Sequence, residues 1–230
     1  MLSMSELEPT EIRDRLAEAL SASVAFDGWS ATALRHAAAD AGISDAEALI
    51  AFPGGAFQAL CYSVRRADRL MLERLAALSL DEMRIRERIA TAVRTRIEVE
   101  PDKEAVRRGI ALLALPQHAP RAAKMTWDTV DAMWRAAGDR SHDYNYYTKR
   151  GLLAGVWTST LLYWLNDRSE GHAGTWAFLD RRIEDVMKVP KLTAPLKQMA
   201  ARLPTPFSVM KRLKAGSPFP PRRRAAGPSD

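Results

Sequence analysis

Apolar residues recur at steps of three and four along almost the whole chain, a spacing that places them on one face of an α-helix. Ala, Leu, Arg and Glu dominate the 230 residues, only 12 are Gly, and long β-branched runs are few. These residue types favour helices over strands. With 47% hydrophobic residues, the chain can bury a substantial core. The sequence therefore predicts an all-α fold, in one large or two small domains.

Capping residues, glycines and prolines mark where the helices should begin and end. Ser30 and Ser44 are suited to cap the helices that follow them, Gly42 can end the second helix, and Pro53 follows the third. The predicted helices cover approximately residues 6–24, 31–41, 45–52, 56–78, 81–99, 103–113, 121–137, 144–166 and 175–189.

Residues 26–60 have the spacing of a helix-turn-helix headpiece. Ala41–Ser44 (AGIS) provides the tight turn between two short helices, and Phe52 with Pro53 closes the second one. This arrangement resembles the headpiece of the TetR superfamily, in which a bundle of long helices around an apolar cavity usually follows. We therefore expect a TetR-like fold with these parts: a headpiece over 1–55, a helical bundle with a cavity over 56–189, a basic amphipathic helix over 190–216 and a disordered basic tail over 217–230.

The second short helix carries the wrong charge for reading DNA. Base edges and phosphates are contacted by Arg, Lys, Asn and Gln, but residues 44–52 provide Asp45 and Glu47 and no cation. Arg35 is the only Lys or Arg between Arg15 and Arg65. The headpiece is therefore expected to be a scaffold, and no nucleic acid is expected as a partner.

The net charge of +6 comes from the C-terminal end of the chain. From Lys188 to Asp230 there are ten cations and one anion, which gives +9 and leaves −3 for residues 1–187. Apolar residues at steps of three or four accompany these cations, as in a basic amphipathic helix on an anionic membrane. Packing of this stripe on the body is the alternative. The predicted membrane-binding residues are Leu196, Met199, Leu203, Phe207, Met210, Leu213, Lys211 and Arg212.

The sequence gives no sign of a membrane span or a targeting segment. The longest apolar run without a charge, residues 151–166, falls short of the roughly 20 residues that span a bilayer. The first ten residues contain two Glu and no Lys or Arg, unlike a secretory signal or a transit peptide. We expect a soluble protein that is not secreted.

The sequence lacks the usual patterns of catalytic and metal sites. GxSxG, HExxH, CxxC, Walker and dinucleotide glycine patterns do not occur, and no His belongs to an ExxH pair. The single cysteine, Cys61, excludes a multi-thiolate site. Asp139, Asp143 and Asp167 suit helix capping better than acid–base work. We expect no enzymatic activity, catalytic residue, metal or cofactor; a small enzyme whose site assembles only on folding is the alternative.

The helix expected over 144–166 is apolar nearly all round, so it should be buried or face a ligand cavity. Gly151 and Gly155, four residues apart, remove side chains from one face and permit either close helix packing or a slot. The residues alone leave core and cavity wall as alternatives. The candidate cavity-lining residues are Leu152, Leu153, Val156, Trp157 and Leu161, with Leu112 and Met125 on neighbouring helices.

The helix expected over 121–137 has apolar residues on two faces, and a small bundle cannot easily bury both. One aromatic side chain should therefore lie at the surface. An exposed Trp beside Met, Asp and a proline-bounded loop has the composition of an interaction hot spot; a partly buried core Trp is the alternative. The candidate partner-binding residues are Trp134, Met133, Asp131, Pro116 and His118.

Three ordered blocks resemble one known family. They are FDGWSATAL (Phe26–Leu34), AMWRAAGDRSHDYNYYTKRGLLAGV (Ala132–Val156) and TWAFLDRRIEDVMKV (Thr175–Val189). They are similar to the ubiquinone-biosynthesis accessory family, the ninth protein of the coenzyme Q series. Two positions depart from the eukaryotic pattern: Gln117-His118 stands where those members tend to read His-Asn, and Ala136 where they often have an aromatic residue.

The resemblance implies a non-catalytic protein that binds a ubiquinone precursor or another isoprenoid lipid in an internal pocket. The bundle over 56–189 would then be the lipid-binding part, and the seven candidate cavity-lining residues become the predicted lipid-binding residues. It also implies that the region around Trp134 docks a di-iron demethoxyubiquinone hydroxylase, to which the lipid is presented at the membrane. A homodimer on the cytoplasmic face of a bacterial inner membrane is expected, held by its basic C-terminus on an anionic surface. A TetR-type transcriptional regulator with a hydrophobic inducer is the alternative.

Overall fold

The computed structural model describes residues 9–140 and 144–202, with side chains over 9–140 and 146–188. Every regular element in these ranges is an α-helix or a short 3-10 helix, and these ranges contain no strand. The all-α prediction is therefore confirmed. The chain divides into two compact units, Met1–Glu184 and Asp185–Asp230. The predicted headpiece and bundle both belong to the first unit.

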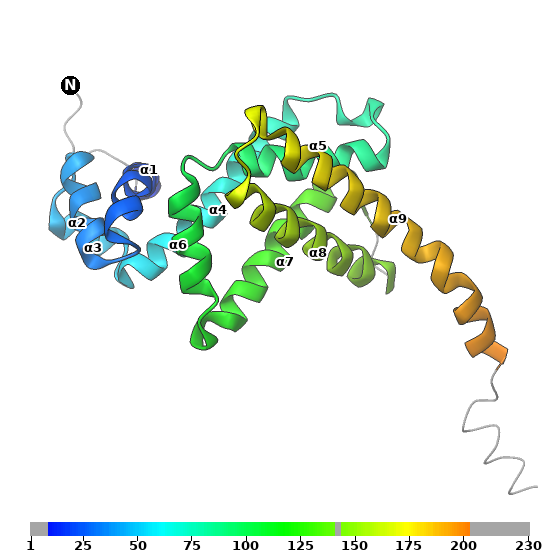
Figure 1. Ribbon diagram of the computed structural model, residues 1–230. Coiled ribbons are helices and arrows are strands. Elements are labelled where there is room, and N and C mark those ends of the chain that lie inside the picture. The colour runs from blue at the N-terminus through cyan, green and yellow to red at the C-terminus, as the bar shows by residue number, and fades with distance from the viewer. Residues whose placement is uncertain (1–8, 141–143, 203–230) are drawn as a thin grey trace, which may run out of the picture. The chain divides into compact units, whose positions relative to one another are not determined.

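The headpiece consists of α1 (Pro9–Asp27), α2 (Ala31–Asp40) and α3 (Asp45–Ala51), which lie together at one end of the first unit (Figure 1). Its core is apolar and includes the fully buried Leu16 and Leu20 of α1. Ser30 caps α2, because its hydroxyl oxygen accepts a hydrogen bond from the Ala33 backbone N–H at 3.1 Å. Ser44 and Glu47 form a reciprocal capping box at the start of α3. Gly42 has φ +67°, the left-handed conformation that lets the chain leave α2.

The helix α4 (Gly55–Ala76) leads from the headpiece into the bundle (Figure 1). There α7 (Ala119–Ala136) packs against α4, α5 (Ile85–Glu98), α6 (Lys103–Leu113) and α8 (Tyr144–Asn166). Met71 of α4, Ile97 of α5, and Val130 and Met133 of α7 are almost completely removed from solvent at the centre of the bundle. The other described elements are the 3-10 helices η2 (Leu80–Glu82), η3 (Pro116–His118) and η4 (Glu170–His172) and the last helix, α9 (Ala173–Arg202).

Two predicted helices differ from those observed. The single helix expected over 81–99 is divided, since Met83 is extended and α5 begins only at Ile85. The Glu87 carboxylate fixes this start by accepting a hydrogen bond from the Arg84 backbone N–H at 3.0 Å.

The other difference lies at Pro190, which directly follows the last predicted helix, 175–189. Instead α9 continues to Arg202, since a proline removes one hydrogen bond of the helix without removing those on either side. Leu196 and Met199 thus lie on α9, although their side chains are outside the described set. None of the described helices has the length and apolar character needed to cross a bilayer. Outside the described residues lie the expected tail and Leu203, Phe207, Met210, Lys211, Arg212 and Leu213.

Candidate functional site

A cavity of about 320 Å³ lies in the first unit, among α1, α4, α6, α7, α8 and the end of α5. Its volume is at the lower end of the range of roughly 300–1,000 Å³ for small-molecule sites. Aliphatic and aromatic side chains make up most of the wall. They include Trp29, Leu60, Val64, Leu70, Ile110, Leu113, Met125, Trp157 and Leu161.

The cavity wall contains three of the seven predicted lipid-binding residues: Met125, Trp157 and Leu161. Two others, Leu153 and Val156, are buried in the core and do not line it. Leu152 and Leu112 are half-buried and also lie off the wall. The sequence did not show which face of α8 meets the cavity. The residues at positions 157, 158, 161 and 162 line the cavity, whereas those at 153, 156, 160 and 164 lie on another face of the helix and are buried in the core.

One part of the wall is charged, and its centre is the buried Arg96 of α5. The Arg96 Nε donates to the Asp68 carboxylate at 2.7 Å, and its Nη1 donates to the Glu100 carboxylate. Its Nη2 donates to the Val64 carbonyl at 3.3 Å. The Thr129 hydroxyl donates to the same Asp68 carboxylate at 3.0 Å. Arg96, Glu100 and Thr129 all line the cavity.

One guanidinium group is therefore shared by two carboxylates. Burial raises the pKa of Asp68 above its ordinary value of 3.8, and the nearby charge of Glu100 acts in the same direction, while Arg96 opposes both. Burial works against the charge of Arg96 too, but Glu100 and Asp68 outweigh it and raise the pKa of that guanidinium. Sequence reasoning missed this cluster because its members come from different helices and form no local motif.

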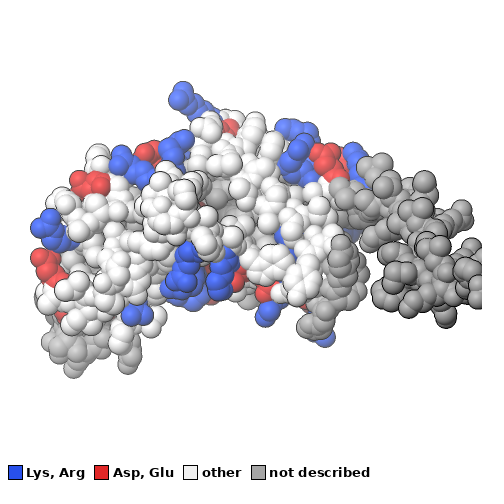
Figure 2. Space-filling view, turned by 90° about the horizontal axis from the view of Figure 1, so that it is seen from below, with Lys and Arg blue, Asp and Glu red and all other residues white. Residues whose placement is uncertain are grey.

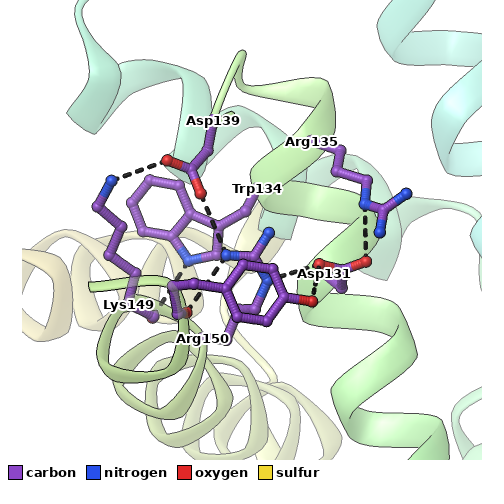
Figure 3. A network of polar contacts seen from close by, with 7 residues as sticks. Asp131, Trp134, Arg135, Asp139, Lys149 and Arg150 are labelled. Carbon is purple, nitrogen blue, oxygen red and sulfur yellow. Dashed lines mark hydrogen bonds and ion pairs between the residues drawn. The ribbon is translucent and has the colours of Figure 1, made fainter. Parts of the chain in front are cut away.

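A second network joins α7 to α8 around Trp134 (Figure 3). Its centre is the buried Arg150, whose Nε donates to the Asp131 carboxylate at 2.5 Å and whose Nη1 donates to the Asp139 carboxylate at 3.1 Å. The ring of Tyr146 stacks on the guanidinium, with 3.5 Å between its centroid and Cζ. Lys149 adds an ion pair to Asp139 at 2.8 Å.

Trp134 is held by this network. Its Nε1 donates to the Lys149 carbonyl at 3.1 Å, and the Lys149 ammonium lies 5.6 Å from the ring centroid. The side chain is half-buried, which is closer to the alternative, a partly buried core Trp, than to an aromatic residue at the surface. Met133 is 0% exposed, which corrects its place in the predicted surface patch, because its helix face points into the bundle.

Pro116 and His118 lie at the opposite end of α7 from Trp134. Sixteen residues of helix between His118 and Trp134 correspond to about 24 Å, so the five predicted partner residues cannot form one small patch. His118 instead stacks on Phe57, with 4.0 Å between ring centroids.

The exposed aromatic residue at the Trp134 end is Tyr147. Its side chain is 65% exposed, and its ring centroid lies 6.0 Å from that of Trp127 and 5.1 Å from that of Tyr146. The sequence signal for this aromatic cluster was the run YNYY, which was interpreted as part of an apolar helix.

The acidic residues considered for catalysis have structural partners where they are described. Asp167 accepts hydrogen bonds from the Thr175 hydroxyl at 2.6 Å and the Ser169 hydroxyl at 2.7 Å, which hold its pKa far below the usual range. It also accepts from the Thr175 backbone N–H near the start of α9, as a capping residue does. Asp139 pairs with Arg150, and Asp143 lies outside the described residues. Within 9–140 and 146–188, no group of His, Cys, Asp and Glu is arranged to hold a metal ion.

Charge is dispersed over the one face of the molecule that Figure 2 shows. On the face shown in Figure 2, Lys and Arg side chains stand in small groups, several of them beside Asp or Glu, with uncharged surface between. The helix α3, which would read DNA in a headpiece of this type, exposes Leu49 and Ile50 at 63% and 76% together with its acidic first turn.

Comparisons with known proteins identify relatives of this chain. The COQ9 family model matches residues 119–190. The rat mitochondrial ubiquinone biosynthesis protein COQ9 is 33% identical over 200 residues, which are 84% of this chain and 64% of that protein. The human protein of the same name is 29% identical over 84% of this chain and 63% of its own length. The COQ9 protein of Drosophila melanogaster is 40% identical over 112 residues, which are 48% of this chain and 34% of that protein.

Among solved structures, a TetR transcriptional regulator from Nitrosomonas europaea is similar in fold. Its TM-score is 0.65 at 21% identity, and the match covers 76% of this chain and 98% of that one. The similarity confirms the TetR-like fold. This chain spans less than two thirds of the rat and human COQ9 proteins. The ordered sequence blocks, the matched family region and the aligned relatives together show that the chain belongs to the COQ9 family.

Proposed function

We propose that this protein takes part in ubiquinone biosynthesis as a non-catalytic accessory protein that binds a ubiquinone precursor or another isoprenoid lipid. The observation that carries the proposal is the apolar cavity of about 320 Å³ in a member of the COQ9 family. The relatives named as ubiquinone biosynthesis proteins support the pathway. A long apolar ligand suits a wall made mostly of aliphatic and aromatic side chains, because it is removed from water on binding.

We further propose that the lipid is presented to a di-iron demethoxyubiquinone hydroxylase at the membrane surface. The exposed Tyr147 beside Trp127 supports a docking site there, since aromatic side chains are enriched at interfaces. The excess of cations after Lys188 supports attachment to an anionic leaflet, which we place on the cytoplasmic face of a bacterial inner membrane. A homodimer also stays a prediction.

Lipid binding can be tested by native mass spectrometry of the purified protein, which should reveal a co-purified quinone or isoprenoid lipid. Leu161→Phe should reduce the bound fraction severalfold, because Leu161 lines the cavity and the larger ring occupies part of it. Leu152→Phe is the matched control: the same substitution, on the same helix and at a half-buried position off the wall. Equal lipid content in both variants and the parent would exclude this cavity as the site.

The TetR-like fold also suits a transcriptional regulator, which we consider less well supported. Asp45 and Glu47 would face the DNA phosphates from the start of α3, and like charges repel. Fluorescence anisotropy near physiological salt should detect only weak binding that is indifferent to sequence. A specific complex tighter than about 10⁻⁸ M would favour the regulator instead.

A further inference from the structure

Negative charge exceeds positive charge among the side chains at the cavity wall. Arg96 is shared by Asp68 and Glu100, so this cluster has one more carboxylate than cation. Asp102, which also lines the cavity, caps α6 by accepting a hydrogen bond from the Ala105 backbone N–H at 2.8 Å. The wall therefore carries negative charge at both of these places.

The remaining lining cation, Arg66, is paired as well. It contacts Asp14 at 3.4 Å and Glu18 at 3.1 Å, and Arg69 joins the same Asp14 at 2.7 Å. These two cations and two carboxylates balance one another. Neither arginine of the wall thus offers a positive charge in excess of its own carboxylate partners.

We propose that Arg96, Glu100 and Thr129 form the headgroup end of the cavity and select a lipid whose head is uncharged and donates a hydrogen bond, such as a phenol or an alcohol, over a lipid with an anionic head. This inference rests on the proposed function, because it presupposes that the cavity holds a lipid. It adds the chemical class of the head.

Hydrogen-bonding capacity supports the choice of a donor. Arg96 is fully buried and already donates to Asp68, Glu100 and Val64. The Glu100 carboxylate lines the cavity, and an ionised carboxylate has about four lone-pair positions. One of them receives the hydrogen bond from Arg96, so this carboxylate has further capacity to accept from a ligand hydroxyl.

Electrostatics supports the rejection of an anion. A carboxylate or phosphate beside Glu100 would meet a like charge in a largely apolar enclosure, where charge interactions are stronger than in water. It could displace Glu100 from Arg96 only by leaving that carboxylate without its cation. An uncharged head avoids both costs.

Three probes with the same apolar part separate these possibilities: 4-octylphenol, 4-octylanisole and 4-octylbenzoate at pH 8. Their affinities for the full chain can be measured by displacement of the uncharged fluorophore N-phenyl-1-naphthylamine. The phenol should bind most tightly, about tenfold or more above the benzoate, and the anisole, which lacks a donor, should fall between them.

Glu100→Gln should reduce the preference for phenol over benzoate to about threefold or less, because it removes the excess charge while keeping an acceptor of the same shape. Glu98→Gln is the matched control: it removes a charge two residues away, from a side chain that is 43% exposed and pairs with Arg94 at the surface. This control should leave the preference unchanged.

The outcomes distinguish the two proposals. If no probe displaces the fluorophore, the cavity binds no lipid and both proposals fail. If all three bind equally well, or if Glu98→Gln changes the preference as much as Glu100→Gln, only the headgroup inference is overturned. The comparison of the three probes in the parent protein does not depend on any variant folding.

Discussion

Arg96 and Arg150 are the largest side chains that are almost completely buried in the described part of the chain, and each lies between two carboxylates. A buried ion pair is a poor source of net stability, because taking the charges out of water offsets most of their attraction. Removing one partner of such a pair nevertheless lowers stability strongly, since the charge that remains is buried without that partner. Both arginines are therefore expected to be sensitive positions for stability.

Arg150→Met should lower the free energy of unfolding by about 3 kcal/mol, the lower end of the cost of breaking a buried pair, because Asp131 and Asp139 lose their buried cation but keep Arg135 and Lys149. Urea denaturation measures this change. Arg135→Met is the control: Arg135 also pairs with Asp131, at 2.8 Å, but its side chain is 69% exposed. Its loss should cost no more than about 1 kcal/mol. Equal effects of the two variants would contradict the central role of Arg150.

The raised pKa of Asp68 predicts an unusual dependence on pH. Its folded pKa lies above 3.8, so the folded state holds this proton more tightly than the unfolded state. The contribution of Asp68 to stability is therefore fully present below pH 3.8 and decreases as pH rises through the folded pKa. Urea denaturation from pH 4 to pH 7 should show that the parent's stability relative to Asp68→Asn falls as pH rises. A rise instead would mean that the pairing with Arg96 outweighs burial.

At the scale of elements, α8 has three kinds of neighbour. Its first turns meet α7 through Tyr146 and Arg150, one later stripe is buried in the core, and the adjacent stripe with Trp157 and Leu161 faces the cavity. A helix with neighbours on several sides needs apolar residues nearly all round, which explains its weak amphipathic pattern.

Tyr147→Ala should weaken binding to the di-iron demethoxyubiquinone hydroxylase by about thirtyfold if Tyr147 is a hot spot worth about 2 kcal/mol. The melting temperature should hardly change, because the side chain is mostly exposed. Isothermal titration calorimetry and thermal unfolding measure the two effects. Trp134→Ala is expected to lower both affinity and stability, since Trp134 is half-buried and donates to the Lys149 carbonyl. Undiminished affinity of Tyr147→Ala would move the docking site elsewhere.

At the scale of the whole molecule, charge and core are separated along the chain. Among the side chains that the structure describes, those of the core belong to the unit that ends at Glu184, whereas the excess of cations in the sequence begins at Lys188. Membrane binding and folding are therefore expected to depend on different parts of the sequence.

Deletion of residues 191–230 removes nine cations and one anion. It should abolish sedimentation with vesicles that contain anionic lipid, because each cation near such a surface contributes about 1 kcal/mol. Binding by the full chain should require anionic lipid and fall as salt increases. The truncated protein should unfold at nearly the same urea concentration as the parent. Vesicle binding that survives the deletion would refute the assignment.

Local chemistry determined much of this structure. Helix periodicity, the serine caps before α2 and α3 and the left-handed Gly42 depend on neighbours within a few residues, so they could be predicted, as could the COQ9 family from its ordered blocks. The distribution of charge along the chain needed no structure at all. The predicted end of the last helix at Val189 was wrong, since α9 continues to Arg202.

Contacts between distant residues decided the rest. Periodicity grouped Leu153, Trp157 and Leu161 on one apolar helix but could not show which of its faces meets a cavity and which meets another helix. It likewise could not place Met133 inside and Trp134 at the boundary. The cluster of Asp68, Arg96, Glu100 and Thr129 has no sequence signature, because its four side chains meet only when α4, α5 and α7 pack together. Contacts of this kind depend on how whole helices pack together, which no local sequence pattern encodes.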